Sequence, residues 1–137
     1  MQSDQSSLNE YYSQYQSTVN QLKALTTQQS QVFTAIQELE HNITTIVGLQ
    51  SKRESQDVMI PMGGILHVKA ELIDSEKILV NIGSDVIVPL KYDEAKSYIE
   101  TRVVEMREIN NRMNDDMVRL EGLASQLQSQ MDQFQKE

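Results

Sequence analysis

The C-terminal region of the sequence carries a stripe of apolar residues whose spacing alternates between four and three. The stripe consists of Ile99, Val103, Met106, Asn110, Met113, Met117, Leu120, Ala124, Leu127, Met131 and Phe134. Such alternation averages 3.5 residues, which returns side chains to one seam of a helix and is the repeat of a coiled coil. The sequence therefore predicts a coiled-coil helix over residues 92–136.

Asn110 is the polar member of this stripe and admits two interpretations. A buried amide needs a hydrogen-bond partner, so Asn110 can fix the register in which two helices pair. It can equally face water if the seam is only partly covered at that level. We favour the register role.

A second, less regular stripe predicts a coiled-coil helix over residues 7–56. Its members are Leu8, Tyr12, Tyr15, Val19, Leu22, Leu25, Gln29, Val32, Ile36, Leu39, Ile43 and Ile46. Two successive steps of three end at Leu22 and Leu25, and this irregularity predicts a local shift of heptad phase. Ser7 followed by Glu10 matches a capping box, which predicts that the helix begins there.

Residues 57–91 change to a period of two and contain both prolines and three of the five glycines. Four short runs of alternating apolar and polar residues are separated by Gly63-Gly64, by a turn at Asp74-Ser75-Glu76-Lys77, and by Gly83-Ser84-Asp85. Alternation bounded by glycine-containing turns is typical of β-hairpins. The segment therefore predicts four strands in two hairpins, with Pro61 and Pro89 on strand edges.

A β segment that reverses the chain between two helices of matched length requires the helices to pack antiparallel. The predicted fold class is α+β: a long antiparallel two-helix coiled coil with two β-hairpins between the helices. We expect a single elongated unit, with both termini together at the end far from the hairpins.

Hairpins of two strands are marginally stable alone and leave unpaired edges. We therefore expect the β region to pair with β segments of other subunits, so that the chain is an obligate oligomer. The residues expected at this contact are Val58, Ile60, Leu66, Val68, Ala70, Leu72, Ile78, Val80, Ile82, Val86 and Val88.

Apolar and aromatic residues also gather where the two stripes reach the chain ends. They are Leu8, Tyr11, Tyr12, Tyr15, Val19, Leu127, Met131 and Phe134. In one interpretation they close the last turns of the coiled coil. In the other they form an adaptable apolar surface, since Met and Tyr repack readily against varied partners. Both interpretations can hold together.

Three segments of the β region resemble prefoldin α-class subunits. They are Ile60-Pro61-Met62-Gly63-Gly64, Val68-Lys69-Ala70 and Lys77-Ile78-Leu79-Val80-Asn81-Ile82-Gly83. Glu94-Ala95 resembles the start of the second helix in that family. In the arrangement of its helices the whole chain is similar to these subunits, and its short length favours an archaeal member.

The resemblance implies an ATP-independent holdase. Two α-type and four β-type subunits would form a hexamer on a shared β-barrel platform, from which six coiled coils extend. Non-native client proteins would be held between the ends of the coils and handed to a group II chaperonin in the cytoplasm. No cofactor is implied.

Other function classes find little support. The net charge of −8 argues against nucleic acid as a partner, and no apolar run approaches the roughly 20 residues that span a membrane. The chain has no cysteine, and we expect neither a metal site nor catalytic residues, with His41 and His67 solvated. The alternative from another class is a structural coiled-coil adaptor that joins native protein partners.

Overall fold

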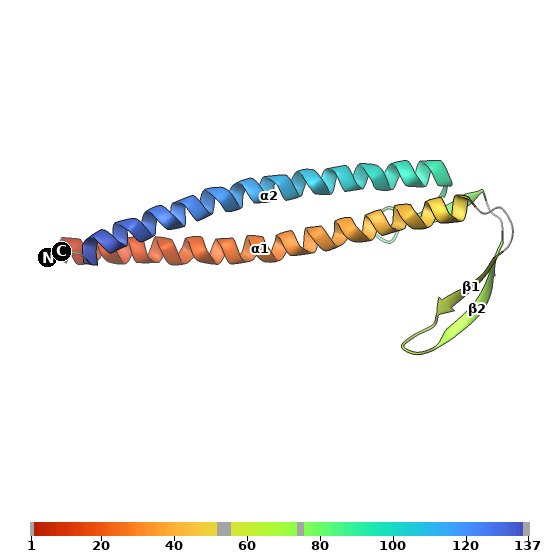
Figure 1. Ribbon diagram of the computed structural model, residues 1–137, viewed down its shortest axis with the longest axis horizontal. Helices are drawn as coiled ribbons and strands as arrows, with labels where there is room; N and C mark the ends of the chain where they lie inside the picture. Colours follow the sequence, from red (N-terminus) through yellow and green to blue (C-terminus); the bar gives the residue numbers. More distant parts are fainter. Residues whose placement is uncertain (1, 52–55, 74–75, 136–137) are drawn as a thin grey trace. The chain divides into compact units, whose positions relative to one another are not determined.

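The computed structural model describes residues 2–51, 56–73 and 76–135. Along the chain the elements are α1 (Gln2–Gln50), β1 (Gln56–Pro61), β2 (His67–Leu72), β3 (Lys77–Asn81), β4 (Ile87–Lys91) and α2 (Tyr92–Gln135) (Figure 1). β1 pairs antiparallel with β2, and β3 pairs antiparallel with β4. This confirms the α+β class, with two long helices and two hairpins between them. The predicted turn at residues 74–77 lies partly outside the described residues.

The chain divides into two compact units. Unit 1 comprises residues 1–36 and 104–137, and unit 2 comprises residues 37–103. Each helix contributes to both units, whereas both hairpins belong to unit 2. The single elongated unit expected from the sequence stays a prediction.

The seam of α1 in unit 1 is more regular than the sequence predicted. The less exposed positions include Leu8, Tyr11, Tyr15, Thr18, Leu22, Leu25, Gln29, Val32 and Ile36, which alternate by three and four throughout. The predicted phase shift after Leu22 is therefore wrong. Tyr11 and Thr18 take the seam positions that had been assigned to Tyr12 and Val19.

The burial of Thr18 explains why the apolar pattern assigned Val19 to the seam of α1. Its side chain is only 5% exposed, and its hydroxyl donates a hydrogen bond of 2.8 Å to the carbonyl oxygen of Gln14. The polar atom is thus satisfied inside the helix, so the rest of the side chain packs as a small apolar group. A search for apolar residues alone selects Val19, which is half-buried beside the seam.

The ends of α1 also differ from the prediction. The helix begins at Gln2, so Ser7 lies inside it and the capping box is wrong. Asp4 lies in the first turn, where its negative charge favours the positive end of the helix dipole. The helix ends at Gln50 rather than at residue 56, because Gln56 already belongs to β1.

The seam of α2 follows the predicted stripe. Ile99, Val103, Leu120 and Leu127 are buried, and Asn110 is half-buried among them. The helix begins at Tyr92, with Asp93 and Glu94 in its first turn. The last predicted position, residue 136, lies outside the described residues.

In unit 2 the second hairpin packs against the two helices. The core of this unit contains Ile46 of α1 with Ala95 and Ile99 of α2. The partly buried residues packed against it are Leu39, Ile43, Ile78, Val80, Leu90, Tyr92 and Tyr98. The core therefore receives one face of the β3–β4 hairpin, which it joins to both helices.

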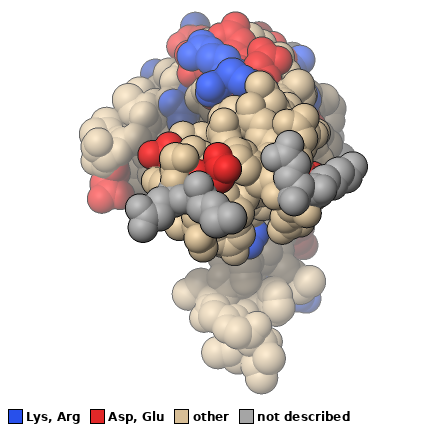
Figure 2. Space-filling view, turned by 90° about the vertical axis from the view of Figure 1, so that its left-hand side faces the viewer, with Lys and Arg blue, Asp and Glu red and all other residues tan. Residues whose placement is uncertain are grey.

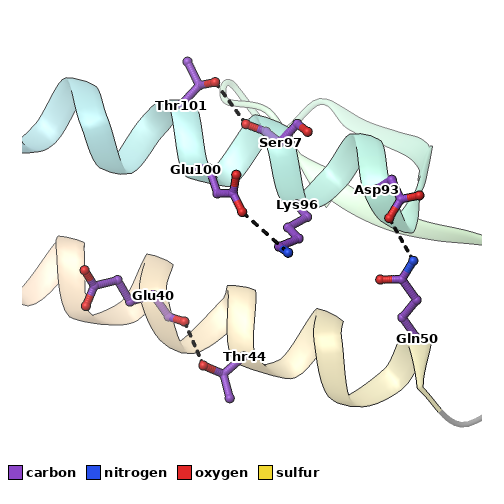
Figure 3. A network of polar contacts seen from close by, with 8 residues as sticks. All are labelled: Glu40, Thr44, Gln50, Asp93, Lys96, Ser97, Glu100 and Thr101. Atoms are coloured by element: carbon purple, nitrogen blue, oxygen red, sulfur yellow. Dashed lines mark hydrogen bonds and ion pairs between the residues drawn. The ribbon is translucent and has the colours of Figure 1, made fainter.

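One polar contact joins the two helices of unit 2, and another lies within α2 (Figure 3). The side-chain amide of Gln50, at the end of α1, donates a hydrogen bond of 2.8 Å to Oδ1 of Asp93, at the start of α2. Lys96 lies 3.8 Å from Glu100 on the next turn of α2. These groups are solvent-exposed, so the apolar core supplies most of the stability.

The first hairpin places its apolar residues on one face without covering them. Register pairs Val58 with Ala70 and Ile60 with Val68, and residues paired across antiparallel strands share a face. Among the described residues, none from β1 or β2 joins the core of unit 2. This apolar face therefore has no partner in the described part of the chain.

The hairpin turns need glycine at one position each. Gly63 and Gly83 both have φ of 115°, which L-residues with side chains rarely adopt. In the second turn Ser84 and Asp85 also have positive φ, of 52° and 60°. Two successive positive values are typical of a type I′ turn, which matches the right-handed twist of the flanking strands.

Ala95 should be intolerant of a larger side chain because it is completely buried where the helices and the second hairpin meet. We expect Ala95→Leu to lower the free energy of unfolding by about 1–3 kcal/mol through overpacking. Ala24→Leu is a matched control, since Ala24 is exposed on α1. Chemical denaturation followed by circular dichroism measures both, and equal stability of the two variants would contradict the packing described here.

Asn110 tests the role of the polar seam position. Replacing it by Leu should bury additional apolar surface and add about 1 kcal/mol to the free energy of unfolding. The melting temperature should rise by roughly 3–5 °C, while the pairing register becomes looser. Asn111→Leu is the control at the neighbouring exposed position. Thermal melts report stability, and hydrogen exchange along the helices reports register. A lower melting temperature for Asn110→Leu would count against the register role.

Candidate functional site

The seam of unit 1 is closed by an aromatic pair near both chain ends. The rings of Tyr11 and Phe134 have centroids 5.7 Å apart and planes inclined by 43°, a geometry that favours aromatic packing. Leu127 is buried in the same unit, with 3% of its side chain exposed. Since Tyr11 lies near the N-terminus and Phe134 near the C-terminus, the contact confirms antiparallel pairing there.

An open groove of about 270 Å³ lies beside this seam. It is lined by Leu8, Asn9, Tyr12, Tyr15, Gln128, Met131, Asp132 and Gln135. Tyr12 is 61% exposed, because its position on α1 turns the ring away from the seam that Tyr11 occupies. The groove therefore combines two aromatic rings and two aliphatic side chains with amides and one carboxylate.

The residues that the sequence had grouped at the helix ends fall into two overlapping sets in the structure. Tyr11, Leu127 and Phe134 pack in unit 1 as parts of the seam. Leu8, Tyr12, Tyr15 and Met131 line the groove. Val19 is half-buried and lies outside the groove lining. Leu8, Tyr15 and Met131 are half-buried seam positions that also line the groove, whereas Tyr12 is exposed there. Binding of a partner by these residues stays a prediction.

Sequence reasoning missed the polar lining of the groove. Asn9, Gln128, Asp132 and Gln135 lie one position from a seam residue. Neighbours of a seam residue flank the contact between two helices, so the spacing itself carried a usable signal. A search restricted to apolar residues passes over them.

The surface near the helix ends is weakly charged. Figure 2 shows mostly uncharged tan atoms in this view, with red acidic side chains in several places and blue basic side chains mixed with red ones at the top. From the sequence, residues 2–22 and 120–135 contain Asp4, Glu10, Glu121 and Asp132, but no Lys or Arg.

A second candidate surface is the apolar face of the β1–β2 hairpin in unit 2. Ile60 and Val68 are 44% and 49% exposed, and Val58 and Ala70 are half-buried. Leu66 and Leu72 also lie on this hairpin and are exposed, at 65% and 36%. An uncovered cluster of this kind on a small hairpin is typical of an interaction surface.

The second hairpin contributes less to such a surface than the sequence suggested. Ile78 and Val80 pack on the core of their own chain, and Val88 is half-buried opposite Val80. The turn-flanking residues Ile82 and Val86 are exposed. On the outer face, Leu79 and Ile87 are 70% and 60% exposed, and sequence reasoning missed both because it followed only the other set of alternating residues.

Ile65 and Ile73 are two further exposed apolar residues of the β region that sequence reasoning missed. They are 93% and 78% exposed. Ile65 lies in the turn between β1 and β2, and Ile73 directly follows β2. Neither belongs to a run of alternating residues, so the period of two does not identify them.

The described residues offer little for metal or catalytic chemistry. Within them no group of three or more His, Asp or Glu side chains is arranged to hold a metal ion. His41 and His67 are exposed. Over the same residues, no helix combines the length and the apolar character needed to cross a membrane.

Comparison with known proteins connects these surfaces to a family. The model of the prefoldin subunit family matches residues 18–137. A prefoldin subunit alpha of Methanospirillum hungatei is 27% identical over 131 residues, covering 96% of this chain and 85% of the relative. That of Methanoculleus marisnigri is also 27% identical, covering 91% of this chain and 78% of the relative.

A solved structure agrees in fold. The filamentous PFD of Methanocaldococcus jannaschii, determined by cryo-electron microscopy, superposes with a TM-score of 0.74 at 22% identity. The superposition covers 89% of this chain and 98% of the other. With two heptad-patterned helices, two intervening hairpins and a family match over most of its length, this chain belongs to the prefoldin family of chaperone subunits, in its archaeal alpha class.

Proposed function

We propose that the chain is an ATP-independent holdase subunit that binds non-native proteins at the ends of its helices. The observation that carries this proposal is the groove beside the closed seam of unit 1. There the ring of Tyr12 is 61% exposed and offers apolar surface that the seam does not use, beside the half-buried side chain of Met131. Residues that are free while the seam stays closed can bind a client without unfolding the helix pair.

Binding of this kind needs no chemical step. Each groove offers a small contact of adaptable residues, so its affinity for one unfolded segment is low. Several such ends in one complex raise the effective concentration of contacts and retain the client. Because the complex binds the unfolded state, it lowers the concentration of chains that are free to aggregate.

The proposed assembly surface is the apolar face of the β1–β2 hairpin. Assembly of this chain with other prefoldin subunits follows from its family. The finer proposal is a hexamer with two alpha-type and four beta-type subunits, in which hairpins of neighbouring chains cover Val58, Ile60, Val68 and Ala70. Support comes from the exposure of Ile60 and Val68 on a face that nothing in the described chain covers.

Transfer to a group II chaperonin completes the proposal. A client held by many weak contacts is released when a stronger binder competes for it, without nucleotide hydrolysis in the holdase. The cytoplasm, where newly made chains and chaperonins meet, is the proposed location.

Removal of residues 1–12 and 129–137 tests the proposed binding region. We expect the truncated chain to lose protection of a denatured client in a light-scattering assay, because most of the groove lining is removed. The complex should keep its number of subunits, as measured by native mass spectrometry, since both hairpins lie in unit 2. Unchanged protection would remove the proposal. Saturable binding to one native protein without any effect on aggregation would favour the structural adaptor.

Substitutions of Tyr11 and Tyr12 distinguish a role in the seam from a role in the groove. Tyr12→Ser should weaken client protection several-fold and leave the melting temperature unchanged, because Tyr12 is exposed in the groove. Tyr11→Ser should instead reduce stability near the chain ends by about 1 kcal/mol through loss of the contact with Phe134. Light scattering and hydrogen exchange separate the two effects. The reverse assignment of effects would contradict the proposed division between seam and groove.

A further inference from the structure

The groove of unit 1 has a specific chemical character. Asp132 is the only ionisable carboxylate among its lining residues, beside two tyrosines and the aliphatic side chains of Leu8 and Met131. Asp132 is exposed, so its charge is available to a ligand entering from solvent. A carboxylate next to aromatic rings and aliphatic surface suits a cation that is carried on an apolar stem.

The surroundings of the groove have the same sign of charge. Asp4, Glu10 and Glu121 are exposed, and from the sequence neither residues 2–22 nor residues 120–135 contain a Lys or Arg. The next two residues of the chain, Lys136 and Glu137, offset each other in formal charge. Charges within about 10 Å still act on one another at ordinary ionic strength. Glu10, which follows the lining residue Asn9, therefore adds to the negative charge of Asp132 and favours basic segments over acidic ones.

We propose that the groove takes the side chain of a Lys or Arg from a non-native segment that is otherwise apolar. The methylene stem would lie along Leu8 and Met131, and the cationic group would meet Asp132 and the face of a tyrosine ring. Long basic side chains bury their stems while keeping the charge near polar groups, and cations are attracted to aromatic faces. This inference rests on the proposed function and gives it a preference among clients.

Peptides of matched composition test the preference. The probes are fluorescently labelled unstructured peptides with identical apolar residues, whose polar positions are all Lys, all Ser or all Glu. Anisotropy titrations with the full chain in its native complex should rank affinity as Lys above Ser above Glu. The Lys peptide should bind about fivefold more tightly than the Glu peptide, and added salt should narrow the difference.

Two variants test whether the preference for the Lys peptide depends on Asp132. Asp132→Asn should weaken binding of the Lys peptide about threefold and leave the Ser peptide unchanged, a size expected for one exposed charge contact. Asp115→Asn removes the same charge from an exposed position of α2 outside the groove and should change neither affinity.

The outcomes separate the inference from the proposed function. Equal binding of the three peptides overturns the preference and leaves the holdase proposal in place. Equal effects of Asp132→Asn and Asp115→Asn also overturn it, because the general negative charge would then explain the ranking. Failure of every peptide to bind overturns the proposed function together with this inference.

Discussion

The antiparallel seam between α1 and α2 is the constraint on which the other features depend. A seam accepts only the residues that return every three or four positions, and every neighbouring residue is left beside it. Tyr11 pairs with Phe134 in the seam, while Tyr12 lines the groove and stays exposed. The same pairing that stabilises the helix ends thus leaves Tyr12 free there. Closure of the seam therefore does not use the ring of Tyr12.

The two hairpins of unit 2 differ in whether they pack on the core of their own chain. The β3–β4 hairpin places Ile78 and Val80 on the core around Ala95, so it is fixed to the helices of its own chain. The β1–β2 hairpin contributes nothing to that core among the described residues. One hairpin is thus anchored to its own chain, and the other keeps apolar area exposed.

The period of the sequence predicted the class of fold because heptad and alternating patterns reflect the geometry of helices and strands directly. The prediction of individual seam residues failed where a buried residue is polar. Thr18 is buried with its hydroxyl satisfied by the backbone, so a stripe built from apolar residues alone chose Val19. Ile78 and Val80 had the correct alternation, yet alternation does not say whether the helices or another subunit covers a face. The groove residue Asp132 is polar, so a stripe of apolar residues did not select it, although it is the neighbour of the seam residue Met131.

The central claim is that other chains cover the apolar face of the β1–β2 hairpin. Sedimentation velocity of the complex assembled from this chain and a beta-type subunit, compared with two variants of β2, tests it most directly. Val68→Glu places a negative charge on the apolar face. Lys69→Glu introduces the same residue on the opposite face, where it replaces a positive charge. The account predicts that Val68→Glu dissociates the complex and that Lys69→Glu leaves it assembled. A complex that remains intact with Val68→Glu would contradict it.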